Sequence, residues 1–99
     1  MHPMTNEILK KLESHRHDLK AYGVRSLGLF GSYARGEQRE GSDVDFVVDF
    51  ERKSFDAYMD LKSYLENLLG CGVDLVISDT IKPRLRDPIL AEALHAQGL

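Results

Sequence analysis

The chain has 99 residues, of which 42% are hydrophobic and 29% are charged, and its formal net charge is −3. This length favours a single domain over residues 1–99, and the acidic balance argues against a general nucleic-acid binder, which normally carries a basic excess. Its apolar stretches fall short of the roughly 20 residues needed to span a bilayer, so no membrane association is expected.

The cysteine content and the amino-terminal segment bear on the compartment. Cys71 stands alone, which excludes a disulfide within the chain and a cysteine-based zinc site. The first 20 residues lack a continuous apolar core and a small-residue cleavage site, so they do not read as a secretion signal. We therefore expect a cytoplasmic protein.

The first third of the chain predicts a helix followed by a strand. Apolar residues at helical spacing predict a helix over residues 5–22, with Thr5 as its N-cap and Gly23 as its stop. The segment VRSLGLF, at 24–30, is short and apolar and predicts a buried strand. After Gly31 the chain is expected to turn directly into a short helix.

Two more strands are predicted from strict alternation. In DVDFVVDF, at 43–50, apolar residues point to one face, and Asp43 and Asp45 point to the other. The segment at 73–78 repeats this pattern and places Asp74 opposite its apolar residues.

The remaining segments predict helices. Apolar residues at three- and four-residue steps from Phe55 predict a helix that closes near Gly70. Asp87 and Pro88 read as the N-cap and first position of a last helix, with an apolar stripe before Gly98. The order of helices and strands indicates a compact α/β domain.

The acidic residues are the first candidates for chemistry. Residues two apart on a strand point the same way, so the carboxylates of Asp43 and Asp45 can converge, and carboxylate oxygens suit hard ions such as Mg²⁺ or Mn²⁺. If the strand bearing Asp74 pairs beside them, three carboxylates share one face. Such a set can hold two metal ions about 3.5–4 Å apart, an arrangement suited to in-line phosphoryl transfer.

The turn after the first strand supplies a candidate phosphate site. Gly31 lets the backbone approach a ligand closely, and Ser32 offers its hydroxyl and neighbouring amides to an anion such as a triphosphate. Arg35, one turn later, adds charge to the phosphates or pins the loop, and the structural role is favoured. A Gly-Ser turn after a strand and an Asp-x-Asp pattern are each usually structural, whereas their combination indicates a functional site.

Other polar residues have ordinary interpretations. Asp49 lies on the acidic face near the strand end and is expected to be solvent-exposed. Arg84 and Arg86 are interpreted as surface arginines rather than phosphate ligands. Tyr33 is interpreted equally well as a partly exposed loop aromatic or as a residue packed near a nucleotide base.

The motif Gly31-Ser32, ten intervening residues, then Asp43-x-Asp45, with Asp74 on a later strand, resembles the nucleotidyltransferase superfamily of DNA polymerase beta. The segment GSYARGEQREGSDVDFVVDF looks like its minimal, MNT-type branch. The resemblance implies a small mixed sheet backed by helices. It also implies that the first two aspartates bind metal, that Asp74 is a third carboxylate and base, and that the turn contacts the nucleotide phosphates.

The same resemblance implies a reaction and a partner. In this superfamily an acceptor hydroxyl attacks the α-phosphate of a nucleoside triphosphate, and pyrophosphate leaves. Larger members carry a further domain, so a partner is expected to complete the site in this short chain. Minimal members resemble antitoxins that pair with HEPN-domain ribonuclease toxins and transfer AMP from ATP to a toxin tyrosine, with Mg²⁺ as the metal.

Two rival functions come from other classes. The site could be vestigial in a binding module that neutralises its partner by contact alone. The Asp-x-Asp pattern also occurs in glycosyltransferases, where it grips a metal bound to a sugar nucleotide. A chain of 99 residues leaves little room for a sugar-nucleotide domain, so this third interpretation is disfavoured.

Overall fold

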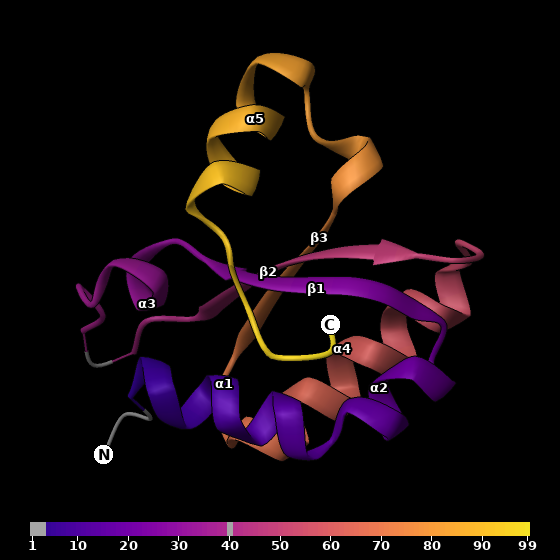
Figure 1. The fold of residues 1–99 in the computed structure, drawn as a ribbon, viewed down its shortest axis with the longest axis horizontal. Helices are drawn as coiled ribbons and strands as arrows, with labels where there is room; N and C mark the ends of the chain where they lie inside the picture. Colours follow the sequence, from indigo (N-terminus) through magenta and orange to yellow (C-terminus); the bar gives the residue numbers. More distant parts are fainter. Residues whose placement is uncertain (1–3, 40) are drawn as a thin grey trace.

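A four-stranded mixed sheet in the order β3-β2-β1-β4 organises the computed structural model, which describes residues 4–39 and 41–99 (Figure 1). The elements are α1 (Thr5–Ser14), α2 (Arg16–Ala21), β1 (Val24–Phe30), α3 (Ser32–Arg35), β2 (Val44–Phe50), α4 (Phe55–Leu69), β3 (Val73–Ile77), the 3₁₀ turn η1 (Ser78–Thr80), α5 (Pro83–Glu92) and β4 (Leu94–His95). β1 is antiparallel to β2 and β4, and β2 is parallel to β3. This arrangement confirms the predicted small mixed sheet flanked by helices.

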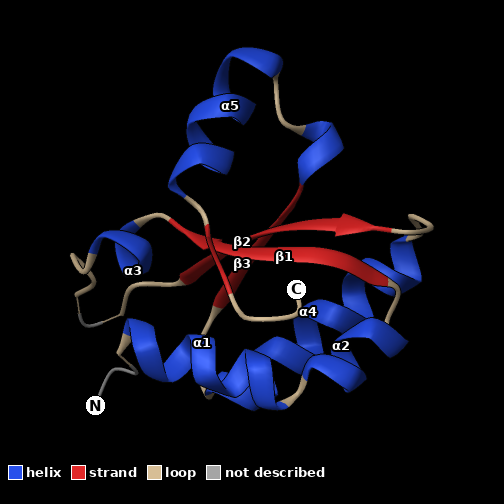
Figure 2. Ribbon diagram, in the orientation of Figure 1, coloured by secondary structure: helices blue, strands red, loops and turns tan. Residues whose placement is uncertain are grey.

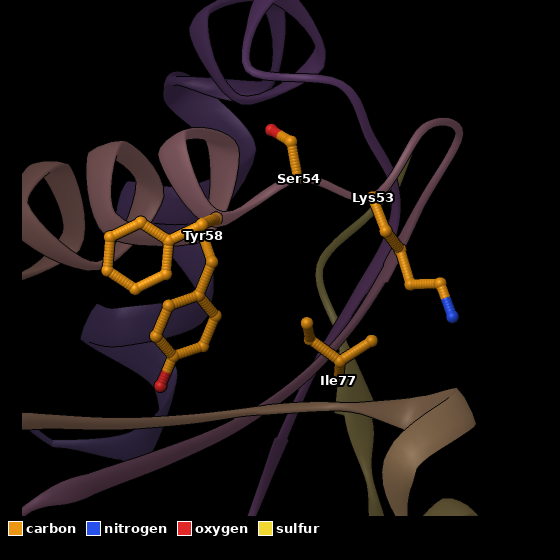
Figure 3. A pocket seen from close by; sticks show the side chains of 5 residues that line it. Lys53, Ser54, Tyr58 and Ile77 are labelled. Carbon is orange, nitrogen blue, oxygen red and sulfur yellow. The ribbon is translucent and has the colours of Figure 1, made fainter.

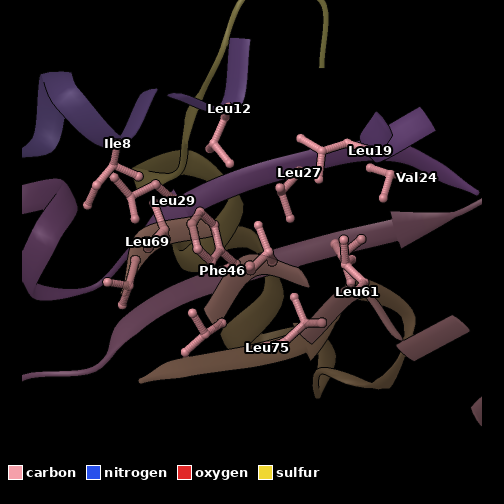
Figure 4. Close-up of a cluster of buried hydrophobic side chains, with 14 of the residues drawn as sticks. Ile8, Leu12, Leu19, Val24, Leu27, Leu29, Phe46, Leu61, Leu69 and Leu75 are labelled. Carbon is pink, nitrogen blue, oxygen red and sulfur yellow. The ribbon is translucent and has the colours of Figure 1, made fainter. Parts of the chain in front are cut away.

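The two faces of the sheet differ. Helices α1, α2 and α4 cover one face, whereas α5 stands on the other side and leaves much of that face uncovered (Figure 2). The alternating apolar residues of the strands point toward the three helices, as the sequence predicted. The fully buried residues between sheet and helices are Ile8, Leu12, Leu19, Leu27, Leu29, Val44, Phe46, Val48, Leu61 and Leu65 (Figure 4). Burying each such side chain contributes about 1.5–3 kcal/mol, so this layer fixes the positions of β1 and β2.

The predicted first helix is wrong in its continuity and its cap. It is two helices, α1 and α2, separated at His15, whose amide is shared between the carbonyls of Lys11 and Leu12. Such a bifurcated bond tightens the last turn and ends the regular helix. Met4 occupies the N-cap position without a side-chain bond, and the Thr5 hydroxyl instead donates to the carbonyl of Tyr33.

The predicted start of the last helix is also wrong. α5 begins at Pro83 rather than at Pro88, since Pro83 occupies the first turn, where a missing N–H costs nothing. Pro88 lies inside the helix, where it removes one backbone hydrogen bond. The predicted apolar stripe of Ile89, Leu90, Ala93 and Leu94 is not buried, because Leu90 and Leu94 are 41% and 38% exposed and α5 has no buried residue.

The chain after α5 forms a short edge strand that the sequence did not predict. In β4, Leu94 and His95 pair with Leu29 and Gly28 of β1. A Cβ on Gly28 would lie 2.9 Å from the Cβ of Ala93, so the glycine allows this close approach. The chain after α5 therefore lies against β1 at the edge of the sheet.

Two more side chains differ from their ordinary interpretations. Tyr33 is 1% exposed and belongs to the core, so it is neither a loop aromatic nor available to a base. Arg86 donates three hydrogen bonds of 3.0–3.1 Å to backbone carbonyls in and beside η1, and it ties α5 to the end of β3. Arg84 is exposed, as expected. None of the helices in residues 4–39 and 41–99 has the length and apolar content to cross a membrane.

Candidate active site

The Gly31 turn is built by the end of β1. Phe30, the last residue of β1, is the register partner of Asp45 on β2, so the chain turns directly beside this aspartate. Gly31 has φ 74° and ψ −151°, a backbone conformation that residues with a Cβ rarely adopt. A Cβ at this position would also collide with the Asp45 carboxylate. The candidate phosphate turn and the candidate metal ligand are therefore in direct proximity.

The predicted pairing of the strand that bears Asp45 with the strand that bears Asp74 is observed. Asp45 on β2 and Asp74 on β3 are register partners in a parallel pair, which puts both side chains on the same face of the sheet. Asp43 comes one residue before β2 and, by strand alternation, belongs to this face. It is the face opposite the three-helix layer, where access from solvent is possible.

Gly72 makes room for the first aspartate. A Cβ on Gly72 would lie 2.5 Å from Oδ1 of Asp43. The carbonyl of Gly72 also accepts a hydrogen bond of 3.0 Å from the amide of Val44. Sequence reasoning missed this residue, because its place opposite Asp43 follows only from the β2-β3 register.

The acidic face carries uncompensated negative charge. Burial raises the pKa of Asp45, and the carboxylates of Asp74 and Asp43 raise it further because like charges disfavour ionisation. Glu92 acts in the same direction, whereas Arg35 lowers the pKa. A cation bound at this face would relieve the repulsion.

Arg35 and Glu92 form an ion pair beside the turn. Nη1 of Arg35 lies 2.6 Å from Oε1 of Glu92, and Nε lies 2.5 Å from Oε1 of Glu37. Hydrogen bonds to these two carboxylates raise the pKa of the guanidinium. The amide of Gly31 donates to Oε2 of Glu92 in a longer contact of 3.4 Å. Arg35 thus pins the loop and the end of α5, as the favoured interpretation held, while Glu92 was not singled out from the sequence.

Comparison with known proteins assigns this constellation to a family. Residues 6–94 match the model of the nucleotidyltransferase domain family. The chain belongs to this nucleotidyltransferase family. Protein adenylyltransferase MntA of Thermococcus cleftensis is 44% identical over 91 residues, which cover 90% of this chain and 92% of the relative.

Two solved structures share the fold of this nucleotidyltransferase. One, provisionally described as a minimal nucleotidyltransferase, is 40% identical, has a TM-score of 0.73, and matches 87% of this chain and 93% of its own. The other is a toxin-antitoxin structure with AMP-PNP, which is 25% identical with a TM-score of 0.69 and matches 88% of this chain and 73% of its own. The resemblance stated from the motif is confirmed.

The donor set of the nucleotidyltransferase fits a hard divalent cation in its chemistry. Asp43, Asp45 and Asp74 offer only carboxylate oxygens, which suit Mg²⁺ or Mn²⁺. Within the described part of the chain, no three acidic, histidine or cysteine side chains are gathered tightly enough to make a ready metal site. The case for a divalent cation therefore rests on two observations: Asp45 and Asp74 share one face of the sheet, and the pKa of Asp45 is raised.

A pocket of about 410 Å³ lies elsewhere on the nucleotidyltransferase (Figure 3). It is lined by Lys53, Ser54, Phe55, Tyr58 and Ile77, which follow or end β2 and β3. The acidic residues lie at the opposite ends of the same two strands. This pocket contains no carboxylate, so it is separate from the candidate active site.

Proposed function

We propose that this nucleotidyltransferase is a Mg²⁺-dependent protein adenylyltransferase that transfers AMP from ATP to a tyrosine hydroxyl of a HEPN-type toxin partner and thereby acts as its antitoxin. The observation that carries the proposal is the pairing of Asp45 with Asp74 directly beside the Gly31 turn. The relative from Thermococcus cleftensis is named a protein adenylyltransferase, and one structural neighbour is a toxin-antitoxin structure with AMP-PNP.

The proposed roles follow from the chemistry of each group. Asp43 and Asp45 would hold two Mg²⁺ ions together with Asp74, and bound Mg²⁺ supplies stabilisation of the charge that develops on the transferring phosphate. Asp74 also accepts the proton of the acceptor hydroxyl, whose oxygen bonds to the α-phosphorus. The bond from the α-phosphorus to the bridging oxygen breaks, and pyrophosphate leaves.

The turn residues are assigned to the triphosphate. The amide of Gly31 and the half-buried hydroxyl of Ser32 donate hydrogen bonds to phosphate oxygens, and the guanidinium of Arg35 adds positive charge. These donors orient the nucleotide so that its α-phosphate faces the carboxylates. Orientation of this kind contributes a large part of the rate enhancement in phosphoryl transfer.

The experiment is transfer of α-labelled ATP to the co-purified partner in the presence of Mg²⁺. The double variant Asp43→Asn with Asp45→Asn should lose at least about 100-fold in rate, since it removes two metal-binding charges while keeping side-chain size. Asp49→Asn is the matched control, because Asp49 lies on the same face of β2 but pairs with Arg25 at 3.5 Å. Intact mass spectrometry should show AMP added to the partner, and peptide mapping should place it on tyrosine.

The rival function predicts a different outcome. A vestigial binding module would neutralise its partner equally well with or without Asp43 and Asp45. Neutralisation that survives the double substitution, together with no labelled partner, would favour the rival and refute the transferase proposal.

A further inference from the structure

Glu92 binds the same groups that the triphosphate is proposed to use. It is the last residue of α5, and its side chain is 28% exposed. One carboxylate oxygen lies 2.6 Å from the Arg35 guanidinium, and the other accepts the Gly31 amide at 3.4 Å. A carboxylate and a phosphate oxygen are both anionic acceptors that favour such donors. A side chain of the protein therefore occupies the turn.

The two donors differ in how many acceptors they can serve. A guanidinium has five N–H groups, so Arg35 is able to bind Glu37, Glu92 and a phosphate together. The backbone amide of Gly31 has one N–H, which cannot satisfy Glu92 and a phosphate oxygen at the same time. Two anions so close also repel each other. Competition is therefore expected at the amide and not merely at the arginine.

The helix that carries Glu92 is weakly held by the rest of the protein. α5 has no buried residue among those described, and the chain beyond Glu92 is held by the two-residue strand β4 and by the buried Ala96. Arg86 anchors the part of α5 that lies near η1. The contacts of Glu92 thus fasten the opposite end of the helix to the active-site turn.

We infer that Glu92 is an internal competitor of the nucleotide triphosphate, which must displace this carboxylate from the Gly31 turn and so loosens the end of α5. The inference rests on the proposed function, because it takes Gly31 and Arg35 as phosphate-binding groups. Binding of the nucleotide and movement of the end of α5 are then coupled. The displaced helix end lies beside the face where an acceptor would approach.

The test compares Glu92→Gln with the matched control Glu37→Gln. Both variants remove one carboxylate from Arg35, but only Glu92 also contacts the Gly31 amide. Binding of a non-hydrolysable ATP analogue with Mg²⁺ is measured by calorimetry. Glu92→Gln should bind about threefold to tenfold more tightly, since no carboxylate then competes with the ligand for the Gly31 amide, and Glu37→Gln should stay within about twofold of the wild type.

Other outcomes would overturn the inference. Unchanged or weaker binding by Glu92→Gln would show that Glu92 orients Arg35 or helps to hold the metal. An equal gain in Glu37→Gln would place the effect at the arginine charge alone. Circular dichroism and urea unfolding check that both variants are folded.

Amide hydrogen exchange of residues 83–92 gives a second measurement. Exchange in α5 should become faster when the wild type binds the analogue, and Glu92→Gln should show the faster rate already without it. Exchange that slows or stays constant on binding contradicts the displacement. If the wild type transfers no AMP to the partner but Glu92→Gln still binds the analogue more tightly, only the proposed acceptor is refuted. If the wild type binds no nucleotide, both proposals are refuted.

Discussion

Gly31 meets two separate requirements, a left-handed backbone and a close approach by the Asp45 carboxylate. Gly70, the C-cap of α4, has a similar φ of 70°, but a Cβ there would meet nothing within 4 Å, so this glycine meets only the first requirement. Alanine at either position should lower the free energy of unfolding by about 1 kcal/mol through backbone strain. Gly31→Ala should lower it further and should abolish binding of the ATP analogue, because Asp45 and the turn must move apart.

Urea unfolding and calorimetry of the two alanine variants provide the measurement. The comparison separates conformational strain from loss of the site, since a Cβ on Gly70 would meet no atom within 4 Å. Equal losses of stability in both variants, with normal analogue binding by Gly31→Ala, would contradict the assigned closeness of turn and carboxylate.

At the scale of elements, the attachment of β4 depends on the absence of a side chain at Gly28. A Cβ there would lie 2.9 Å from the Cβ of Ala93 and 3.0 Å from Nε2 of His95, and the Ala93 methyl has no rotamer in which to retreat. Gly28→Ala should therefore push β4 off β1 and loosen α5. Trypsin should then cut after Arg84 about fivefold to tenfold faster than in the wild type.

The control for β4 is Ser26→Ala, on the same strand but paired with β2 rather than β4. Mass spectrometry of the fragments shows whether the cuts cluster within residues 83–95 or spread over the chain. Unchanged cleavage in Gly28→Ala, or cleavage spread evenly through the chain, would contradict this account of the edge strand.

The elements that could be predicted are those whose pattern is local. Strict alternation is enough to place β2 and β3 and to assign their inward faces, because every inward residue is apolar whereas the outward face of each strand carries an aspartate. β4 could not be found this way, since its two residues pair with β1 only through the tertiary contact at Gly28. The start of α5 was misplaced because Asp87-Pro88 is a good local helix start, and a proline at the first turn, Pro83, is an equally good one.

At the scale of the whole molecule, the site is assembled from segments far apart in sequence. The closeness of Asp45 and Asp74 could be predicted, because strand parity decides the face once two strands are neighbours. The contact of Glu92 with the Gly31 turn could not, since it spans 61 positions and depends on the path of α5. Gly72 likewise acquires its role only through the β2-β3 register. The two missed residues are those whose positions tertiary structure alone determines.

The carboxylates that lie together on one face of the sheet lower the free energy of unfolding of the whole molecule. Burial and the neighbouring carboxylates raise the folded-state pKa of Asp45 above its ordinary value of 3.8. Between these two values the folded chain holds a proton that the unfolded chain has released, so stability falls as pH rises through this window. The penalty is fully present above the folded-state pKa. This loss of stability falls on the face that we propose to bind cations.

Asp45→Asn should therefore stabilise the metal-free protein at pH 7 while it abolishes transfer. The gain in free energy of unfolding over the wild type should grow as pH rises from about 3.8, where a protonated aspartate and an asparagine are nearly equivalent. Mg²⁺ should stabilise the wild type but not the variant, since the proposed metal site needs the Asp45 carboxylate. Urea unfolding across pH, in chelator and then in Mg²⁺ at matched ionic strength, measures both effects. Asp49→Asn should show neither, because its carboxylate already has Arg25 as a partner. A variant less stable than the wild type at pH 7 in chelator would mean that the acidic face is not a source of repulsion, and an equal response of both proteins to Mg²⁺ would place the cation elsewhere.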